Sequence, residues 1–239
     1  MNPLAGVLSE AWQMYKAHAR HLLPIAFVIY LFAGLIAALF GLAGGIGAFF
    51  GLIVSVFAAF LLQAALTKAV QAERESGTEF PVGEAVSAAL PYIGQIAIAS
   101  ILAGIGIAIG LVLLIVPGLI LLTIWALIIP VIVIERSGAL ESFGRSQRLV
   151  RGRGWYVFGT LVLVFIIQLL VALALGVVFS ALPYAFRDGL GTVISGTLIA
   201  PYLALVVTLI YYRLRGADAA AGQPGGGDAG TQWSNHSSF

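Results

Sequence analysis

The feature that most constrains this chain is a series of apolar runs, each close to the roughly 20 residues that an α-helix needs to cross the hydrocarbon core of a bilayer. Hydrophobic residues make up 61% of the sequence and charged residues 9%, against roughly 45–50% and about 25% in soluble domains. We therefore predict an all-α, polytopic membrane protein with six transmembrane helices. The predicted spans cover, approximately, residues 22–40, 47–67, 93–115, 117–134, 155–179 and 190–212.

Three further segments combine apolar residues at helical spacing with charges on the opposite face. They cover residues 2–21, 81–92 and 137–152. We expect such amphipathic helices to lie in the membrane interface; the alternative for the first is that it packs on its own protein. In the third we assign Leu140, Phe143 and Val150 to the apolar side, and we expect Glu141 and Arg145 to form an ion pair one turn apart.

An amphipathic helix followed by two spans occurs three times along the chain. Because each unit crosses the membrane twice, the three copies would be parallel repeats about an axis along the membrane normal. We predict one membrane domain over residues 1–215, with units at about 1–75, 76–136 and 137–215. The segment 216–239 has few large apolar residues and is predicted to be a disordered cytoplasmic tail.

Two prolines mark changes of direction in the third and fourth spans. Proline has no backbone N–H and disfavours helix in the residue before it. Pro117 and Gly118 therefore predict the turn between these spans. Pro130 lies inside the fourth span, where it predicts a kink or the point at which the helix leaves the hydrocarbon.

The basic residues are distributed unevenly over the predicted loops. Cytoplasmic loops hold an excess of Lys and Arg, and Arg187 alone falls on the side opposite to the others. Both termini and the three amphipathic helices are therefore predicted on the cytoplasmic side, where each basic residue near anionic lipid contributes about 1 kcal/mol. The residues assigned to this side are Lys16, Arg20, Lys68, Arg74, Arg136, Arg145, Arg148, Arg151, Arg153, Arg213 and Arg215.

The predicted spans contain essentially no ionisable residue, which leaves proton- or ion-coupled transport without its usual groups. The chain has no cysteine, and it carries no nucleophile motif, phosphate loop or paired carboxylate. His18 and His21 have no third metal ligand near them in sequence. We expect no enzyme activity, cofactor, metal or nucleic-acid partner. The polar residues at bilayer depth are expected to bond between helices: Ser55, Gln63, Ser100, Thr123, Thr160 and Gln168.

Five arginines follow the fourth span within a short stretch, with Glu135 and Glu141 among them. Guanidinium forks suit phosphate oxygens, so an anionic phospholipid headgroup at the cytoplasmic leaflet is the predicted partner. The alternative is that these residues only set topology and anchor the interfacial helices. The candidate headgroup contacts are Arg136, Arg145, Arg148, Arg151 and Arg153.

The same region carries a resemblance to a known family. The residues concerned are Val116-Pro117-Gly118, Trp125, Pro130, Glu135, Ala139-Leu140-Glu141-Ser142, Ser146, Leu149 and Gly152 to Trp155. This string resembles bacterial integral membrane proteins grouped as the membrane domain of glycerophosphoryl diester phosphodiesterase, and the related YciC-like inner-membrane proteins. The resemblance implies a six-span fold in a bacterial inner membrane. The catalytic barrel domain of the enzymes bearing that name has no counterpart in this sequence, so phosphodiesterase activity is not implied.

Three functions are compatible with these observations. The leading hypothesis is a non-enzymatic membrane protein that binds or moves a phospholipid-like amphiphile, because the arginines lie beside spans that proline can kink. The second is a scaffold or assembly factor for envelope proteins, with a protein partner or a second copy of the chain. The third, a membrane-anchoring homologue of a glycerophosphodiesterase module or a lipid enzyme, rests mainly on the resemblance.

Overall fold

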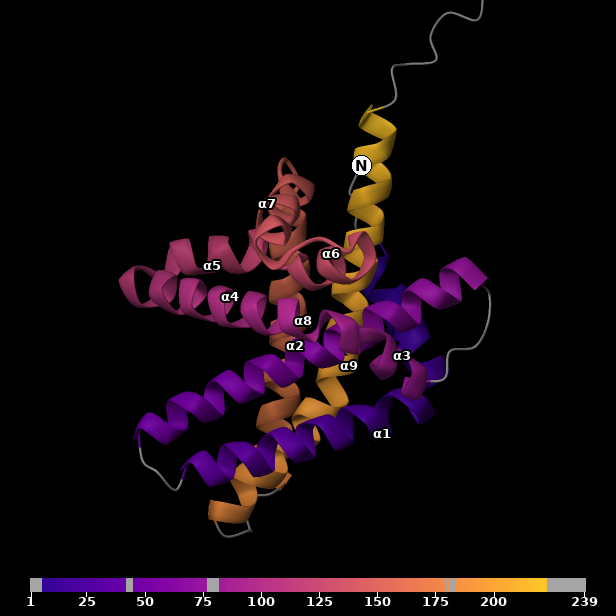
Figure 1. The fold of residues 1–239 in the computed structure, drawn as a ribbon. Helices are drawn as coiled ribbons and strands as arrows, with labels where there is room; N and C mark the ends of the chain where they lie inside the picture. Colours follow the sequence, from indigo (N-terminus) through magenta and orange to yellow (C-terminus); the bar gives the residue numbers. More distant parts are fainter. Residues whose placement is uncertain (1–5, 42–44, 77–81, 179, 181–183, 223–239) are drawn as a thin grey trace, which may run out of the picture.

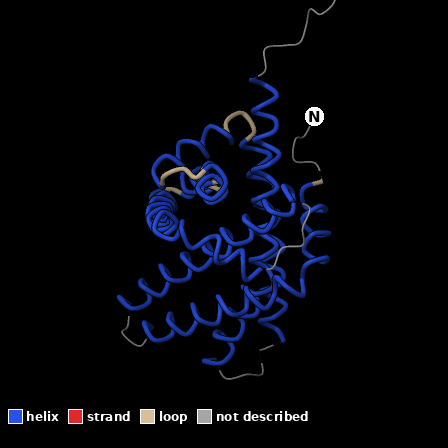
Figure 2. Tube along the Cα trace, turned by 45° about the vertical axis from the view of Figure 1, so that its right-hand side comes forward, coloured by secondary structure: helices blue, strands red, loops and turns tan. Residues whose placement is uncertain are grey.

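The computed structural model describes residues 6–41, 45–76, 82–178, 180 and 184–222. Over these residues the chain is helical, without a strand (Figure 2), which confirms the all-α prediction. The elements are α1 (Val7–Gly41), α2 (Gly45–Ser76), α3 (Val82–Ala89), the 3-10 turn η1 (Leu90–Tyr92), α4 (Ile93–Leu113), α5 (Ile115–Ile124), α6 (Ile128–Glu135), α7 (Ala139–Val150), α8 (Gly154–Val178) and α9 (Tyr184–Gly222).

Five helical stretches are long and apolar enough to cross a membrane, or six if the bent helix α1 counts as one span. Within α1 the segment Val7–Arg20 meets Leu22–Ile36 at 81°. The surface of these helices is apolar to an extent that soluble proteins do not show. Helix α8 is the extreme case, because Val157 and Val164 are the two buried residues of its whole length. The bilayer is the environment that such a surface requires.

Three antiparallel hairpins, α1–α2, α4–α5 and α8–α9, form the framework (Figure 1). In this view the α4–α5 hairpin runs across the upper left, the α8–α9 pair runs vertically, and the α1–α2 hairpin slopes across the picture below α4–α5 and crosses the vertical pair. Helices α2 and α9 hold the hairpins together, since α9 packs on α1, α2, α6, α7 and α8, and α2 packs on α1, α3, α4, α6 and α9. One hairpin corresponds to each predicted unit, while the threefold repeat itself stays a prediction.

The turn between α4 and α5 lies at Leu114, three residues before the predicted position. Pro117 and Gly118 consequently lie in the first turn of α5, where a missing N–H removes no intrahelical hydrogen bond. Gly118 is required by close packing within the hairpin. A Cβ at this position would lie 2.5 Å from the side chain of Leu111 and 2.7 Å from its backbone nitrogen.

Pro130 is the third residue of α6, and the helix is broken over residues 125–127, just before it. The ring of a proline clashes with the carbonyl four residues earlier, so the break lies where the chemistry requires it. Ser146 of α7 closes this break. Its hydroxyl donates to the carbonyl of Ile124 at 2.7 Å and accepts the N–H of Leu127 at 3.2 Å. Because Ser146 is fully buried, α7 is fixed to the break by hydrogen bonds that water cannot replace.

The hydroxyl groups predicted to bond between helices donate instead to carbonyls of their own helices, three or four residues earlier. These are Ser55, Ser100, Thr123 and Thr160. A side chain that reaches its own backbone needs no neighbouring helix to satisfy it. The buried interhelical pair is instead Thr67 of α2 with Thr208 of α9, whose hydroxyl oxygens lie 3.0 Å apart.

The amphipathic segment at the start of α1 packs on its own protein, as the alternative reading allowed. Val7, Ala11 and Tyr15 are buried, and the Tyr15 hydroxyl donates to the carbonyl of Leu198 in α9 at 3.0 Å. Trp12 is half-exposed, and its ring contacts Tyr15 and Tyr202 of α9. Small, apolar and aromatic residues therefore hold the segment to α9.

The C-terminal prediction needs a correction. Helix α9 continues to Gly222, so residues 216–222 are helical rather than disordered. Alanine-rich sequence has high helix propensity, and the helix here extends one that is already anchored by packing. The remainder of the predicted tail, residues 223–239, lies outside the described residues.

Candidate functional site

Helix α7 carries three of the candidate residues, and its buried face decides where they point. Leu140, predicted on the apolar side, is 72% exposed, so that assignment was wrong. The face that packs is made mostly of small side chains, because α7 lies directly on the break between α5 and α6 and a bulky residue would hold it away. The buried residues of α7 are Ala139, Ser142, Ser146, Leu149 and Val150.

Arg145 is held by two carboxylates from other elements. Its Nε–H points at both carboxylate oxygens of Glu135, at 3.2 and 3.0 Å, and its Nη1 donates to Asp218 of α9 at 3.1 Å. Arg145 therefore pairs with these groups, and the predicted pair with Glu141 does not form. The Tyr211 hydroxyl donates to Glu135 at 3.0 Å and fixes the carboxylate from α9.

The bond from Glu135 raises the pKa of Arg145 above its ordinary value. A raised pKa means that Arg145 keeps its charge in the folded protein throughout the physiological pH range, so the ion pair contributes its stability there.

The other four arginines have different surroundings. Arg136 adopts the left-handed conformation at the end of α6, with φ 55°, and its side chain is exposed. Arg148 and Arg151 are exposed near the end of α7. Arg153 is half-buried between α7 and α8. The predicted cluster is thus divided into one internal ion-pair partner and four cations that face outward to different degrees.

A groove of about 780 Å³ lies between α5 and the start of α8. Its volume falls in the range of ligand-binding pockets, roughly 300–1,000 Å³. The hydroxyl of Thr123 in the wall is already bound to the carbonyl of Leu119 at 2.8 Å, so the interior offers chiefly apolar contact. The lining residues are Val116, Leu119, Ile120, Thr123 and Ile124 from α5, with Gly152, Arg153, Gly154, Trp155, Tyr156 and Phe158.

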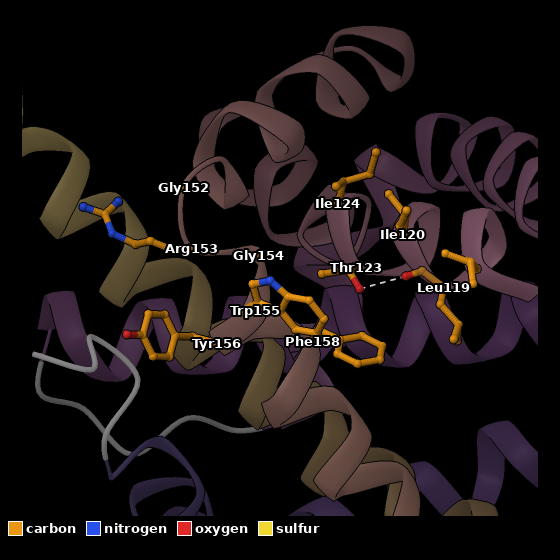
Figure 3. A pocket seen from close by; sticks show the side chains of 11 residues that line it. Leu119, Ile120, Thr123, Ile124, Gly152, Arg153, Gly154, Trp155, Tyr156 and Phe158 are labelled. Atoms are coloured by element: carbon orange, nitrogen blue, oxygen red, sulfur yellow. Dashed lines mark hydrogen bonds between the residues drawn. The ribbon is translucent and has the colours of Figure 1, made fainter.

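Figure 3 shows how polar and apolar side chains divide at this groove. Trp155 and Phe158 lie toward the α5 side chains, whereas Arg153 and Tyr156 extend to the other side. The Trp155 ring is 84% exposed and contacts Phe158 edge-on, with ring centroids 5.8 Å apart. The groove therefore has an apolar interior and a cationic edge. The sequence predicted Arg153 as a headgroup contact but gave no sign that α5 forms the opposite wall of the groove.

A second ion-pair network was not predicted. Glu10 accepts from Arg74 at 2.8 Å and from Arg213 at 2.7 Å, and the Arg74 guanidinium lies 4.8 Å from the ring centroid of Tyr212. These residues come from α1, α2 and α9, so no local spacing signals the contact. Both ion-pair networks have members in the C-terminal part of α9. Arg213 belongs to the network of Glu10, and Tyr211 and Asp218 belong to that of Arg145 and Glu135.

No metal centre is present among the described residues, since no three His, Cys, Asp or Glu side chains are placed to share an ion. The Nδ1 of His18 lies 3.1 Å from the carbonyl of Met14, within its own helix.

The long apolar helices define the molecule as a polytopic α-helical membrane protein, and so do the apolar side chains that α8 exposes along nearly all of its length. No family model, curated protein or solved structure matches the chain. The resemblance to the phosphodiesterase membrane domain therefore stays a prediction.

Proposed function

We propose that this chain is a non-enzymatic protein of a bacterial inner membrane that binds an anionic phospholipid-like amphiphile at the α5–α8 groove. The observation that carries the proposal is the division of the groove into an apolar interior and an edge formed by Arg153 and Tyr156. An acyl chain would contact Trp155 and α5, and the headgroup phosphate would lie at the edge. Arginine binds phosphate oxygens through paired N–H groups.

The surroundings of the groove support an amphiphile over a water-soluble ligand. Helix α8, which forms one wall, exposes apolar side chains along almost its entire length, so a ligand that enters from the side passes through hydrocarbon. Trp155 stands at the start of this helix, and such rings collect at the boundary between headgroups and acyl chains. Arg151 and Arg148 add exposed positive charge beside the same boundary.

The first test fills the groove without changing charge. Ile120 lines it, while Ile109 on α4 does not, and both side chains are 54% exposed. We expect Ile120→Trp to lower the amount of phospholipid retained in native mass spectrometry from a mild detergent, and Ile109→Trp to leave it unchanged. Equal retention in the two variants and the parent protein would contradict the proposed groove.

The second test removes charge at its edge. Arg153→Gln should weaken retention of phosphatidylglycerol relative to phosphatidylcholine, because the guanidinium contacts the phosphate of either lipid but its net charge favours the anionic one. Arg136→Gln is the matched control, since Arg136 is exposed but does not line the groove. The same loss of selectivity in both variants would indicate general surface charge rather than a site.

A scaffold for envelope proteins is the second candidate, and one observation favours it. The exposed length of α8 is also what a partner transmembrane helix would cover. This function predicts that a defined protein, present in fixed ratio and displaced by large substitutions on α8, accompanies the chain in mild detergent. A chain that carries lipid and no protein would remove this candidate.

A further inference from the structure

The guanidinium of Arg145 makes two ion pairs of unequal quality. Toward Glu135 it presents Nε–H to both oxygens, and that carboxylate is also held by the Tyr211 hydroxyl. Toward Asp218 it makes one contact, from Nη1 at 3.1 Å. The side chain of Glu135 is 22% exposed, and that of Asp218 is 49% exposed.

This difference identifies the replaceable partner. Ion pairs between exposed side chains contribute little, because water and salt screen them and holding two long side chains costs entropy. Glu135 lies at the end of the buried helix α6, where it cannot move without disturbing the core. Asp218 lies near the end of α9 at Gly222, and the C-terminal end of this helix projects beyond the rest of the molecule (Figure 1). Asp218 is therefore the carboxylate that a competing anion would displace.

A second arginine follows on the same helix. Arg148 lies three residues after Arg145 in α7, and its Nη1 folds back to within 3.5 Å of the point that a Cβ on Gly144 would occupy. A glycine at this place leaves room for the guanidinium to lie against the helix. Residues three apart are neighbours on a helix surface, so a phosphate at Arg145 would have the Arg148 guanidinium within reach as a second donor of N–H groups.

We propose that Arg145 and Arg148 form a second anion site, specific for a phosphate group, and that Asp218 is the chain's own carboxylate occupying it. A phosphate would replace Asp218 at Nη1 while Glu135 continues to hold Nε. Its binding would release the end of α9, residues 216–222, from α7. The inference rests on the proposed function in taking a lipid headgroup as the source of the phosphate, since free inorganic phosphate has the same chemistry.

The test compares two acidic residues near the same arginines. Asp218→Asn and Glu141→Gln each remove one negative charge, but Glu141 is exposed on α7 and is not bonded to Arg145. We expect Asp218→Asn to tighten binding of a short-chain phosphatidylglycerol to the detergent-solubilised full chain by up to about fivefold, the most that removal of an exposed ion pair would give. Glu141→Gln should change it less. Equal changes in the two variants would overturn the proposal.

Two further measurements test whether Arg145 is the binding residue and identify the source of the phosphate. Arg145→Lys keeps the charge opposite Glu135 but loses the fork, and in that background Asp218→Asn should no longer tighten binding; a gain that persists would exclude Arg145 as the site. Titration with inorganic phosphate in place of lipid distinguishes the sources. A matching gain for phosphate supports the site and assigns it to the free anion, whereas a gain for lipid alone assigns it to the headgroup.

Hydrogen exchange over residues 216–222 provides a readout independent of affinity. Exchange should quicken when phosphatidylglycerol is added and quicken less with phosphatidylcholine, whose headgroup carries no net charge; constant exchange with both would overturn the displacement of Asp218. This outcome is separable from the failure of the proposed groove, which is tested by Ile120→Trp at the α5–α8 contact. Loss of lipid in that variant with unaltered response to Asp218→Asn would show that the two sites are distinct.

Discussion

Replacing Ser146 by alanine should destabilise the protein more than any other change of a single oxygen atom that we consider. Its hydroxyl satisfies the carbonyl of Ile124 and the N–H of Leu127, both at the break before Pro130. The variant leaves two backbone groups without partners, the N–H of the fully buried Leu127 and the carbonyl of the half-buried Ile124. A buried group left unsatisfied costs about 1–3 kcal/mol, so we expect a loss of about 2–4 kcal/mol.

Ser142 offers a matched control on the same face of α7, one turn earlier. It is equally buried, and its hydroxyl donates to the carbonyl of Ala139 at 2.6 Å. That carbonyl belongs to the first turn of the same helix, so Ser142→Ala removes one local bond and should cost about 0.5–1.5 kcal/mol. Both substitutions delete the same atoms, which leaves the broken helix as the difference between them.

The measurement is equilibrium unfolding in mild detergent by added dodecyl sulfate, followed through tryptophan fluorescence. Ser146→Ala should lower the unfolding free energy by about 1–3 kcal/mol more than Ser142→Ala does. Equal losses would refute the view that α7 holds the break, and would mean that the backbone groups at residues 124–127 find other partners when the hydroxyl is removed.

Four further substitutions test particular positions by the same unfolding assay. Gly118→Ala should cost about 1–3 kcal/mol through overpacking against the facing helix, whereas Gly104→Ala, with nothing within 4 Å of its Cβ, should be neutral or gain up to about 1 kcal/mol. Arg136→Gly should stabilise by up to about 1 kcal/mol, because relief of the left-handed conformation exceeds the added chain entropy. Thr208→Val should cost only about 0.6 kcal/mol, since the Thr67 hydroxyl keeps its bond within α2.

The helical fold and the kink at Pro130 could be predicted because they depend on local chemistry. Apolar runs of bilayer length permit helices and little else, and a proline inside a helix removes a backbone hydrogen bond and strains the turn before it. The turn at Leu114 was misplaced by three residues for a related reason. Pro117 and Gly118 carry a turn-like signal, but proline is also compatible with the first turn of a helix, and sequence does not distinguish these positions.

The role of α7 could not be predicted from its own periodicity. Leu140 is larger and more apolar than Ser142 or Ser146, so a scale of hydrophobicity places it inside. In the structure the two serines are buried and Leu140 is exposed, because the surface that α7 covers is a broken helix with unpaired backbone groups. Only a small side chain with a hydroxyl can approach such a surface and also bond to it, and that demand is set by Pro130, sixteen residues away in the chain.

The arginine assignments illustrate a limit of counting charge. Arg74, Arg145 and Arg213 were counted with the other cations, yet each is paired with a carboxylate from a distant segment. The predicted orientation is not weakened by this pairing, because acidic residues contribute little to the rule by which Lys and Arg retain a loop on the cytoplasmic side. Attraction to anionic headgroups does depend on net charge, and pairing lowers it unless the headgroup displaces the carboxylate, as proposed for Arg145. The predicted orientation and the proposed lipid binding would therefore draw on different subsets of the same arginines, with Arg148, Arg151 and Arg153 common to both.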